Sequence, residues 1–326
     1  MQRRTFLGAA TVAAALPMGA RGDTFPSKPI TIVVPVTAGG PSDVMTRIIA
    51  NKLSEELKVP VVVENRTGAA GVVGLVSVIN SKPDGYTLIM AGANVLAILP
   101  NLDTKLSYDV ARDIEPVTLV SKTALGLFIN PRLPVKTVAE LVAYAKANPG
   151  KLTYASAGMA STAHLSAELL SNLAGIEMTH IPYRGSAAAI NDMAGGRVDL
   201  MFDGIATMTH VNSGQLRALA VNGQHRLAAY PELPTMAEAG YPGFTIELWF
   251  CIVGPKGIPQ PVVATLNAAF AKVLRDPGVI ERHVKQGVEL VPTSPAELWA
   301  FSNMQSERMR ELIKARRITL NEDVKN

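Results

Sequence analysis

The first part of the chain alternates between short apolar runs and longer segments with helical spacing. Residues 30–35, ITIVVP, are rich in β-branched side chains and predict a buried strand, and residues 59–64 and 87–90 predict two more. From Val44 to Leu57, apolar residues recur every three or four positions, as on one face of a helix. Strands joined through helices by short links predict a parallel, doubly wound α/β sheet.

A long extended segment, residues 117–130, separates this pattern from a second one. Further strands are expected at 152–155, 178–183, 198–202 and 216–221, with helices ending near Asn148, at 161–173 and at 187–193. This second alternation predicts another α/β lobe.

The last eighty residues contain a strand-like run at 247–253 and two helices, which begin at Pro259 and Pro295. Because no further strands accompany these helices, we expect them to pack on the first lobe, so that the chain crosses between lobes twice. The predicted fold is α/β with two lobes, each a mostly parallel sheet flanked by helices. Lobe 1 comprises residues 23–120 and 249–326, and lobe 2 comprises residues 121–248.

The N-terminus has the pattern of an export signal. Arg3-Arg4 precede an apolar run at 6–16, which is too short to span a bilayer. Residues 20–22 form a small-x-small cleavage site, which would leave Asp23 as the first mature residue. The arginine pair resembles a twin-arginine signal, and an ordinary secretory signal or an uncleaved anchor are the alternatives. With no cysteine near this site a lipoprotein is not expected, and we predict a periplasmic protein.

The charge balance and the single cysteine bear on the binding partner and on thiol chemistry. The chain has 31 basic and 27 acidic residues, and removing residues 1–22 leaves 28 basic against 27 acidic. This near balance does not favour a nucleic-acid partner, which requires a clustered basic face. The single cysteine, Cys251, lies in an apolar run and is interpreted as a buried structural thiol.

Three junctions between a strand and a helix are rich in glycine and hydroxyl residues: TAGGPSD at 37–43, SAGMAST at 156–162 and YRGSA at 183–187. Free N–H groups and the positive dipole end at a helix start bind anions, and glycine allows close approach. In parallel sheets such loops gather at the carboxyl ends of the strands. Junctions from two lobes could therefore hold one small anion between them. The alternative is that Ser42 and Ser161 are ordinary helix caps.

Signatures of catalysis and cofactor binding are absent from the sequence. The glycines from Gly68 to Gly74 follow the spacing G-x-x-G-x-x-G, which indicates a close-packed turn rather than a dinucleotide loop. The five histidines lack metal-ligand spacing, and His164 either lines the cleft or has a helix-surface or packing role. Asp43 and Asp203 are candidates for a carboxylate pair, although Asp43 also suits a helix start and Asp203 a turn. We expect no enzyme, no cofactor and no metal.

A series of short sequence motifs follows in a fixed order along the chain. They are FPSKPI at 25–30, ENRTGA at 64–69, KPDGYTL at 82–88, YASAG at 154–158, YRG at 183–185, GGRVDLMFD at 195–203 and LPTMAEAG at 233–240, followed by Trp249 and Gly254-Pro255. Together they resemble the Bug family, the solute receptors of tripartite tricarboxylate transporters, over residues 25–315.

The resemblance implies a periplasmic-binding-protein fold whose lobes close on a carboxylate, which the first two junctions hold. It also implies that the partners are membrane transporter subunits. From the charge balance we expect no nucleic-acid partner, and we expect a monomer. The junctions and the resemblance together give the candidate ligand-binding residues: Thr37, Ala38, Gly39, Gly40, Ser42, Asp43, Ser156, Ala157, Ser161, Thr162, Tyr183 and Asp203.

This sequence departs from the family pattern at two places near the expected site. Val36 stands where an aromatic residue is usual and Thr37 adds a hydroxyl, while Ser186 replaces the first residue of a Gly-Pro-Ala segment. The ligand therefore stays open among di- and tricarboxylates, amino acids and aromatic acids. A ligand-sensing receptor and an exported enzyme on the same fold are the alternative functions.

Overall fold

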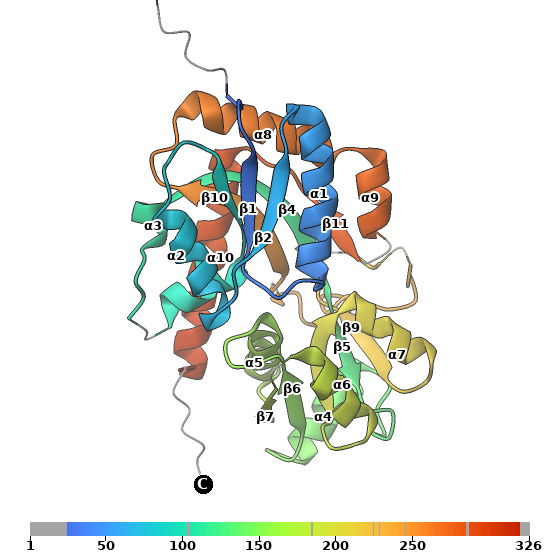
Figure 1. Cartoon of the computed structure of the whole chain (residues 1–326). Coiled ribbons are helices and arrows are strands. Elements are labelled where there is room, and N and C mark those ends of the chain that lie inside the picture. The colour runs from blue at the N-terminus through green and yellow to red at the C-terminus, as the bar shows by residue number, and fades with distance from the viewer. Residues whose placement is uncertain are drawn as a thin grey trace, which may run out of the picture.

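The computed structural model describes residues 25–319 except 103–104, 184, 224, 228, 245 and 285–286. The predicted signal peptide and its cleavage site lie outside these residues. Two lobes are visible, each built around one β-sheet with helices on both sides (Figure 1). The strand orders are β11-β4-β10-β3-β1-β2 in the first sheet and β7-β6-β8-β5-β9 in the second. The predicted two-lobed α/β architecture is confirmed.

The first lobe begins with the predicted strand-helix-strand units. Its early elements are β1 (Ile30–Val34), α1 (Pro41–Leu57), β2 (Val61–Asn65), α2 (Val72–Ile79), β3 (Thr87–Gly92), α3 (Val110–Asp113) and β4 (Ile114–Thr123). Strand β1 pairs in parallel with β2 on one side and β3 on the other. Apart from Thr31, its side chains are apolar on both faces, as expected for a strand whose sheet is covered by helices on both sides.

The second lobe follows directly. It contains β5 (Leu125–Ile129), α4 (Val138–Ala147), β6 (Thr153–Ser156), α5 (Thr162–Ala174), β7 (Thr179–Pro182), α6 (Ser186–Ala194), β8 (Leu200–Gly204), α7 (Met208–Asn212) and β9 (Arg217–Val221). Strand β4 ends at Thr123 and β5 begins at Leu125, so a single residue joins the two sheets.

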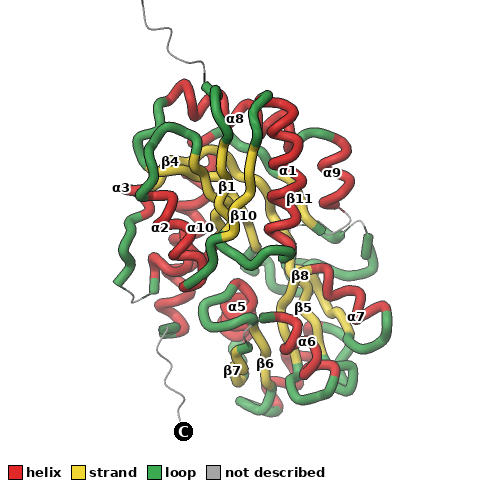
Figure 2. Tube along the Cα trace, in the orientation of Figure 1, coloured by secondary structure: helices red, strands yellow, loops and turns green. Residues whose placement is uncertain are grey.

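The chain then returns to the first lobe, as Figure 2 shows in the same orientation. The returning elements are β10 (Leu248–Pro255), α8 (Gln260–Leu274), α9 (Pro277–Val284), β11 (Val288–Leu290) and α10 (Pro295–Arg316). Helix α8 packs on α1 and β4, and α10 packs on β4. The prediction that the C-terminal helices pack on the first lobe is confirmed.

The sheets are mixed rather than mostly parallel. Of the nine strand pairings among the described residues, four are parallel and five are antiparallel. Four of the antiparallel pairings involve β10 or β5, the strands that continue the chain after each crossing. Each of these two strands runs antiparallel to the strands on both sides of it. The local sequence pattern does not reveal this orientation.

Each sheet has an apolar core on both faces. Ala160 and Leu165, from the second lobe, belong to a core cluster of the first lobe, so the lobes also pack on each other beside α5. Cys251 lies in the same cluster without solvent exposure, and burial raises the pKa of its thiol. The interpretation of Cys251 as a structural thiol agrees with this position. Within the described residues, no helix has both the length and the apolar character needed to cross a membrane.

Candidate ligand-binding site

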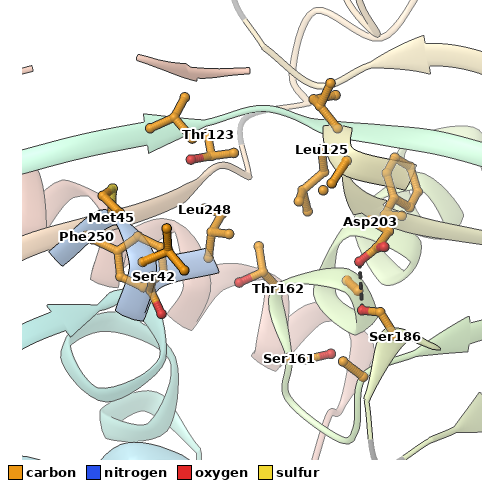
Figure 3. A pocket seen from close by; sticks show the side chains of 18 of the residues that line it. Ser42, Met45, Thr123, Leu125, Ser161, Thr162, Ser186, Asp203, Leu248 and Phe250 are labelled. Carbon is orange, nitrogen blue, oxygen red and sulfur yellow. Dashed lines mark hydrogen bonds between the residues drawn. The ribbon is translucent and has the colours of Figure 1, made fainter. Parts of the chain in front are cut away.

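A cavity of about 640 Å³ lies between the lobes. Figure 3 shows Ser42, Met45 and Phe250 on one side of it and Ser161, Ser186 and Asp203 on the other. The described residues that line it are Gly39, Ser42, Val44, Met45, Thr123, Leu125, Ala157, Ser161, Thr162, Ala163, Ser186, Phe202, Asp203, Gly204, Ile205, Ala206, Leu248, Phe250 and Val288. Both lobes therefore contribute to one enclosure.

The start of α1 forms the first-lobe side of this cavity. Helix α1 begins at Pro41, and the preceding residue, Gly40, has no side chain to cap the first turn. The N–H groups of Ser42 and Asp43, in the first turn, therefore lack a side-chain acceptor from that position. Gly39 has φ 83°, a left-handed conformation that glycine adopts without strain. This loop therefore leaves the first turn of α1 without a capping side chain next to the cavity.

Asp43 faces away from the cavity and holds this loop from behind. Its Oδ2 accepts the N–H of Gly39 at 2.9 Å and Arg47 Nε at 3.0 Å, and its Oδ1 accepts Asn65 Nδ2 at 2.8 Å. The hydrogen bond from Arg47 is the main cause that lowers the pKa of Asp43 to about 2. The side chain is 2% exposed. Asp43 is thus a charged support for the loop, with its charge balanced by Arg47.

The start of α5 forms the second-lobe side. Ser161 caps this helix by accepting the N–H of His164 at 3.2 Å. In return, His164 Nδ1 accepts the N–H of Ala160 at 3.1 Å. Ala160 has φ 57°, an uncommon conformation for a residue with a Cβ. The imidazole is therefore a buried support of the loop and is not a cavity wall.

A second histidine continues this support. His180 Nε2 lies 2.7 Å from Ser156 Oγ, and the His180 ring stacks on His164 at 4.2 Å between centroids. Burial is the largest cause that lowers the pKa of both histidines, to about 4 for His180. A Ser–His contact of this length is typical of an activated nucleophile, but Ser156 has no exposed surface for a substrate to reach.

The end of β8 supplies a polar corner of the cavity. Asp203 is half-buried, and its two oxygens accept Ser186 Oγ at 2.8 Å and Thr207 Oγ1 at 2.5 Å. Tyr183, from the third junction, donates to Asp192 Oδ2 at 2.9 Å instead of reaching the cavity. Burial, with Asp192 beside it, raises the pKa of Tyr183 to about 12.

Six of the predicted site residues line the cavity: Gly39, Ser42, Ala157, Ser161, Thr162 and Asp203. The other six lie in the same loops or directly behind them and do not line it: Thr37, Ala38, Gly40, Asp43, Ser156 and Tyr183. The expected carboxylate pair is not formed across the cavity, because Asp203 faces it and Asp43 is turned toward Arg47.

The apolar wall is the part of the site that sequence reasoning missed. Its members come from α1, β5, β8 and the turn after it, β10 and β11: Val44, Met45, Leu125, Phe202, Ile205, Leu248, Phe250 and Val288. In the sequence these residues have the same pattern as core residues, so their neighbours in the chain do not identify them as cavity-lining residues. Among the described lining residues there is no lysine, arginine or histidine. An anion would be held here by hydroxyl and backbone N–H donors, and a hydrocarbon body would contact the wall.

The sequence of this chain is similar to that of a known protein family. Residues 45–318 match a protein family described as the tripartite tricarboxylate transporter family receptor. The chain belongs to this family. BugT of Bordetella pertussis is 36% identical over 307 residues, which make up 94% of each chain. The resemblance to the Bug family is therefore confirmed, and the receptor is a member of a family of periplasmic binding proteins.

Two solved structures share the fold of this receptor. An R. palustris protein determined with adipate is 34% identical with a TM-score of 0.81, and the match covers 90% of this chain and 99% of that one. MatC from Rhodopseudomonas palustris, determined with malate, is 31% identical with a TM-score of 0.76, covering 89% and 100%. Members of the family are solute-binding receptors and not enzymes, which confirms that prediction.

Proposed function

We propose that this receptor captures a small organic carboxylate between its lobes in the periplasm and delivers it to the membrane subunits of a tripartite tricarboxylate transporter. The observation that carries the proposal is that the starts of α1 and α5, one from each lobe, contribute residues to a single cavity. Two R. palustris relatives have been determined with adipate and with malate, both carboxylates.

In the proposed complex, neutral donors hold the carboxylate. The hydroxyl of Ser161 accepts the N–H of His164 and still has its own proton to donate to a ligand. Ser42 and Thr162 add two more hydroxyls at the two helix starts. Helices of 17 and 13 residues direct the positive ends of their dipoles to the same place.

The remainder of the ligand contacts the apolar wall. Val44 and Met45 lie one turn into α1, and Leu248 and Phe250 lie on the returning strand β10. Such a surface suits the hydrocarbon part of an aliphatic or aromatic acid. We include in this proposal the export signal at residues 1–22, cleavage after Gly22, and a monomeric mature protein.

Thermal unfolding of the chain from Asp23 onward tests the proposal. A panel of adipate, malate, benzoate and amino acids is compared with the matching amides. A true ligand present at about 100 times its Kd adds about 2.7 kcal/mol to the free energy of unfolding. We expect one acid to raise the melting temperature while its amide does not. If no acid acts, and mass spectrometry of the denatured protein finds no retained ligand, carboxylate binding is wrong.

A variant locates the binding site within the same experiment. Thr162→Val keeps the size of the side chain and removes its hydroxyl, so the affinity for the acid found in the panel should fall about tenfold or more. Thr265→Val, on the exposed face of α8, is the matched control and should bind as the parent does. Equal affinity for all three proteins would place the ligand away from α5.

A further inference from the structure

The second loop of the cavity is backed by two stacked imidazoles that do not line the cavity themselves. His164 is 3% exposed, and its ring lies 4.2 Å from that of His180, with 19° between the ring planes. His180 in turn stacks on Tyr154 at 4.8 Å. The loop in front of them carries Ala157, Ser161 and Thr162, which do line the cavity.

Each imidazole holds one end of that loop through a hydrogen bond. His164 Nδ1 accepts the N–H of Ala160 at 3.1 Å, which requires this nitrogen to carry no proton. The bond stabilises the left-handed conformation of Ala160, φ 57°, which is unfavourable for a residue with a Cβ. At the other end, His180 Nε2 contacts Ser156 Oγ, which also bonds to the backbone of Gly158.

We propose that His164 and His180 are positioning residues for the ligand, and that protonation of this pair on acidification releases the loop and weakens ligand binding. The inference rests on the proposed function, because its functional consequence is a loss of affinity. When His164 gains a proton at Nδ1, that nitrogen becomes a donor and can no longer accept the N–H of Ala160. Two donors then face each other in a buried space.

Burial and the neighbouring charged groups determine the pH at which the two histidines are protonated. Burial disfavours the charged form of both rings, and a charge on His164 disfavours one on His180. Glu168 acts in the opposite direction on both. It is itself engaged by Tyr154 at 2.6 Å and by Arg316, from α10 of the other lobe, at 2.7 Å. The lowered pKa values place the release on the acidic side of neutrality.

Hydrogen exchange at the Ala160 amide, followed by NMR on the unliganded chain from Asp23 onward, tests the loop without a ligand. We expect its protection factor to fall about tenfold or more between about pH 7 and about pH 3.5, a range that extends below the pKa of about 4 for His180, as the histidine ring signals titrate. His164→Asn retains an acceptor near the Nδ1 position and does not titrate, so protection should persist at low pH. His164→Ala should lack protection at both pH values.

Two further variants complete the design. His180→Gln keeps a polar atom near the Nε2 position and should reduce the pH dependence, while His210→Asn, at a surface helix end, should behave as the parent does. Adipate, used as the binding probe in calorimetry, should lose affinity at low pH with the parent and keep it with His164→Asn. Protection at Ala160 that is unchanged as the histidines titrate, or lost equally in His164→Asn, would overturn the inference. Absence of adipate binding at every pH would count against the proposed ligand class, and the exchange result would still decide the role of the histidines.

Discussion

Asp43 and His164 occupy the same position in two different helices. Each is the third residue of its helix, and each accepts the backbone N–H of the residue four positions earlier, Gly39 before α1 and Ala160 before α5. The two loops that meet at the cavity are therefore held from behind by the same kind of contact. The two side chains differ in charge. The pKa of Asp43 is lowered to about 2, so this carboxylate is ionised near neutral pH. Burial lowers the pKa of His164 and favours its neutral ring.

Replacing the support of the first loop should weaken both folding and binding. In Asp43→Asn, an amide N–H₂ must replace one oxygen and will face Asn65 or the Gly39 and Arg47 donors. We expect the free energy of unfolding to fall by about 1–3 kcal/mol, measured by urea denaturation. Glu55→Gln, an exposed position of the same helix, should change it by less than about 0.5 kcal/mol. Equal stability of Asp43→Asn and the parent would contradict the supporting role.

Acidification should destabilise the unliganded protein in two steps. The pKa of His180 is lowered from 6.5 to about 4, so between these values the folded state binds fewer protons than the unfolded state. The stability that this group contributes is present above about pH 6.5 and is lost as the pH falls toward 4. Asp43 follows between pH 3.8 and about 2. Urea denaturation across this range measures both steps, and His180→Gln should flatten the first. A first step of unchanged size in that variant would contradict the assignment.

The ion pair between α10 and α5 should hold the lobes together. Arg316 Nε lies 2.7 Å from Glu168 Oε2, and the two side chains are 26% and 13% exposed. We expect Arg316→Ala to lower the free energy of unfolding by about 1–3 kcal/mol and to increase the radius of gyration in X-ray scattering. Arg310→Ala removes an exposed pair with Glu307 on the same helix and should do neither. Identical scattering of parent and Arg316→Ala would show that this pair does not restrain the lobes.

The glycines from Gly68 to Gly74 should resist enlargement. A Cβ added at Gly74 would lie 2.8 Å from the carbonyl oxygen of Arg66 and 3.0 Å from Pro35 Cβ. We expect Gly74→Ala to destabilise by about 1–3 kcal/mol. Gly204→Ala is a suitable control, because its φ is −60° and no atom lies within 4 Å of the added Cβ. A harmless Gly74→Ala would contradict the interpretation of this segment as a close-packed turn.

Features encoded by neighbouring residues were predictable. The strand before Gly39, the glycine break and the helix after Pro41 follow one another within a few residues, so periodicity and turn chemistry locate the first loop. The same reasoning locates Ser161 as the start of α5.

Features that depend on distant parts of the chain were not predictable. The direction of β10 relative to β3 depends on the path of the whole chain through the second lobe. In the sequence, Phe250 has the pattern of a core residue. In the structure it lines the cavity, because the second lobe lies across from it. The orientation of the Asp43 side chain depends on Asn65, twenty-two residues later. Composition alone does not distinguish a supporting residue from a lining residue.

The lack of basic side chains among the described lining residues has a consequence for how such receptors diverge. If the main chain and small hydroxyls recognise the acid group, the residues that determine the fit of the ligand body are free to vary without affecting that recognition. Exchanges at Val44, Met45 or Phe250 would then change which acid is preferred while leaving acid binding in place. A single scaffold could thus be adapted, by natural drift or by a designer, to a series of different nutrients.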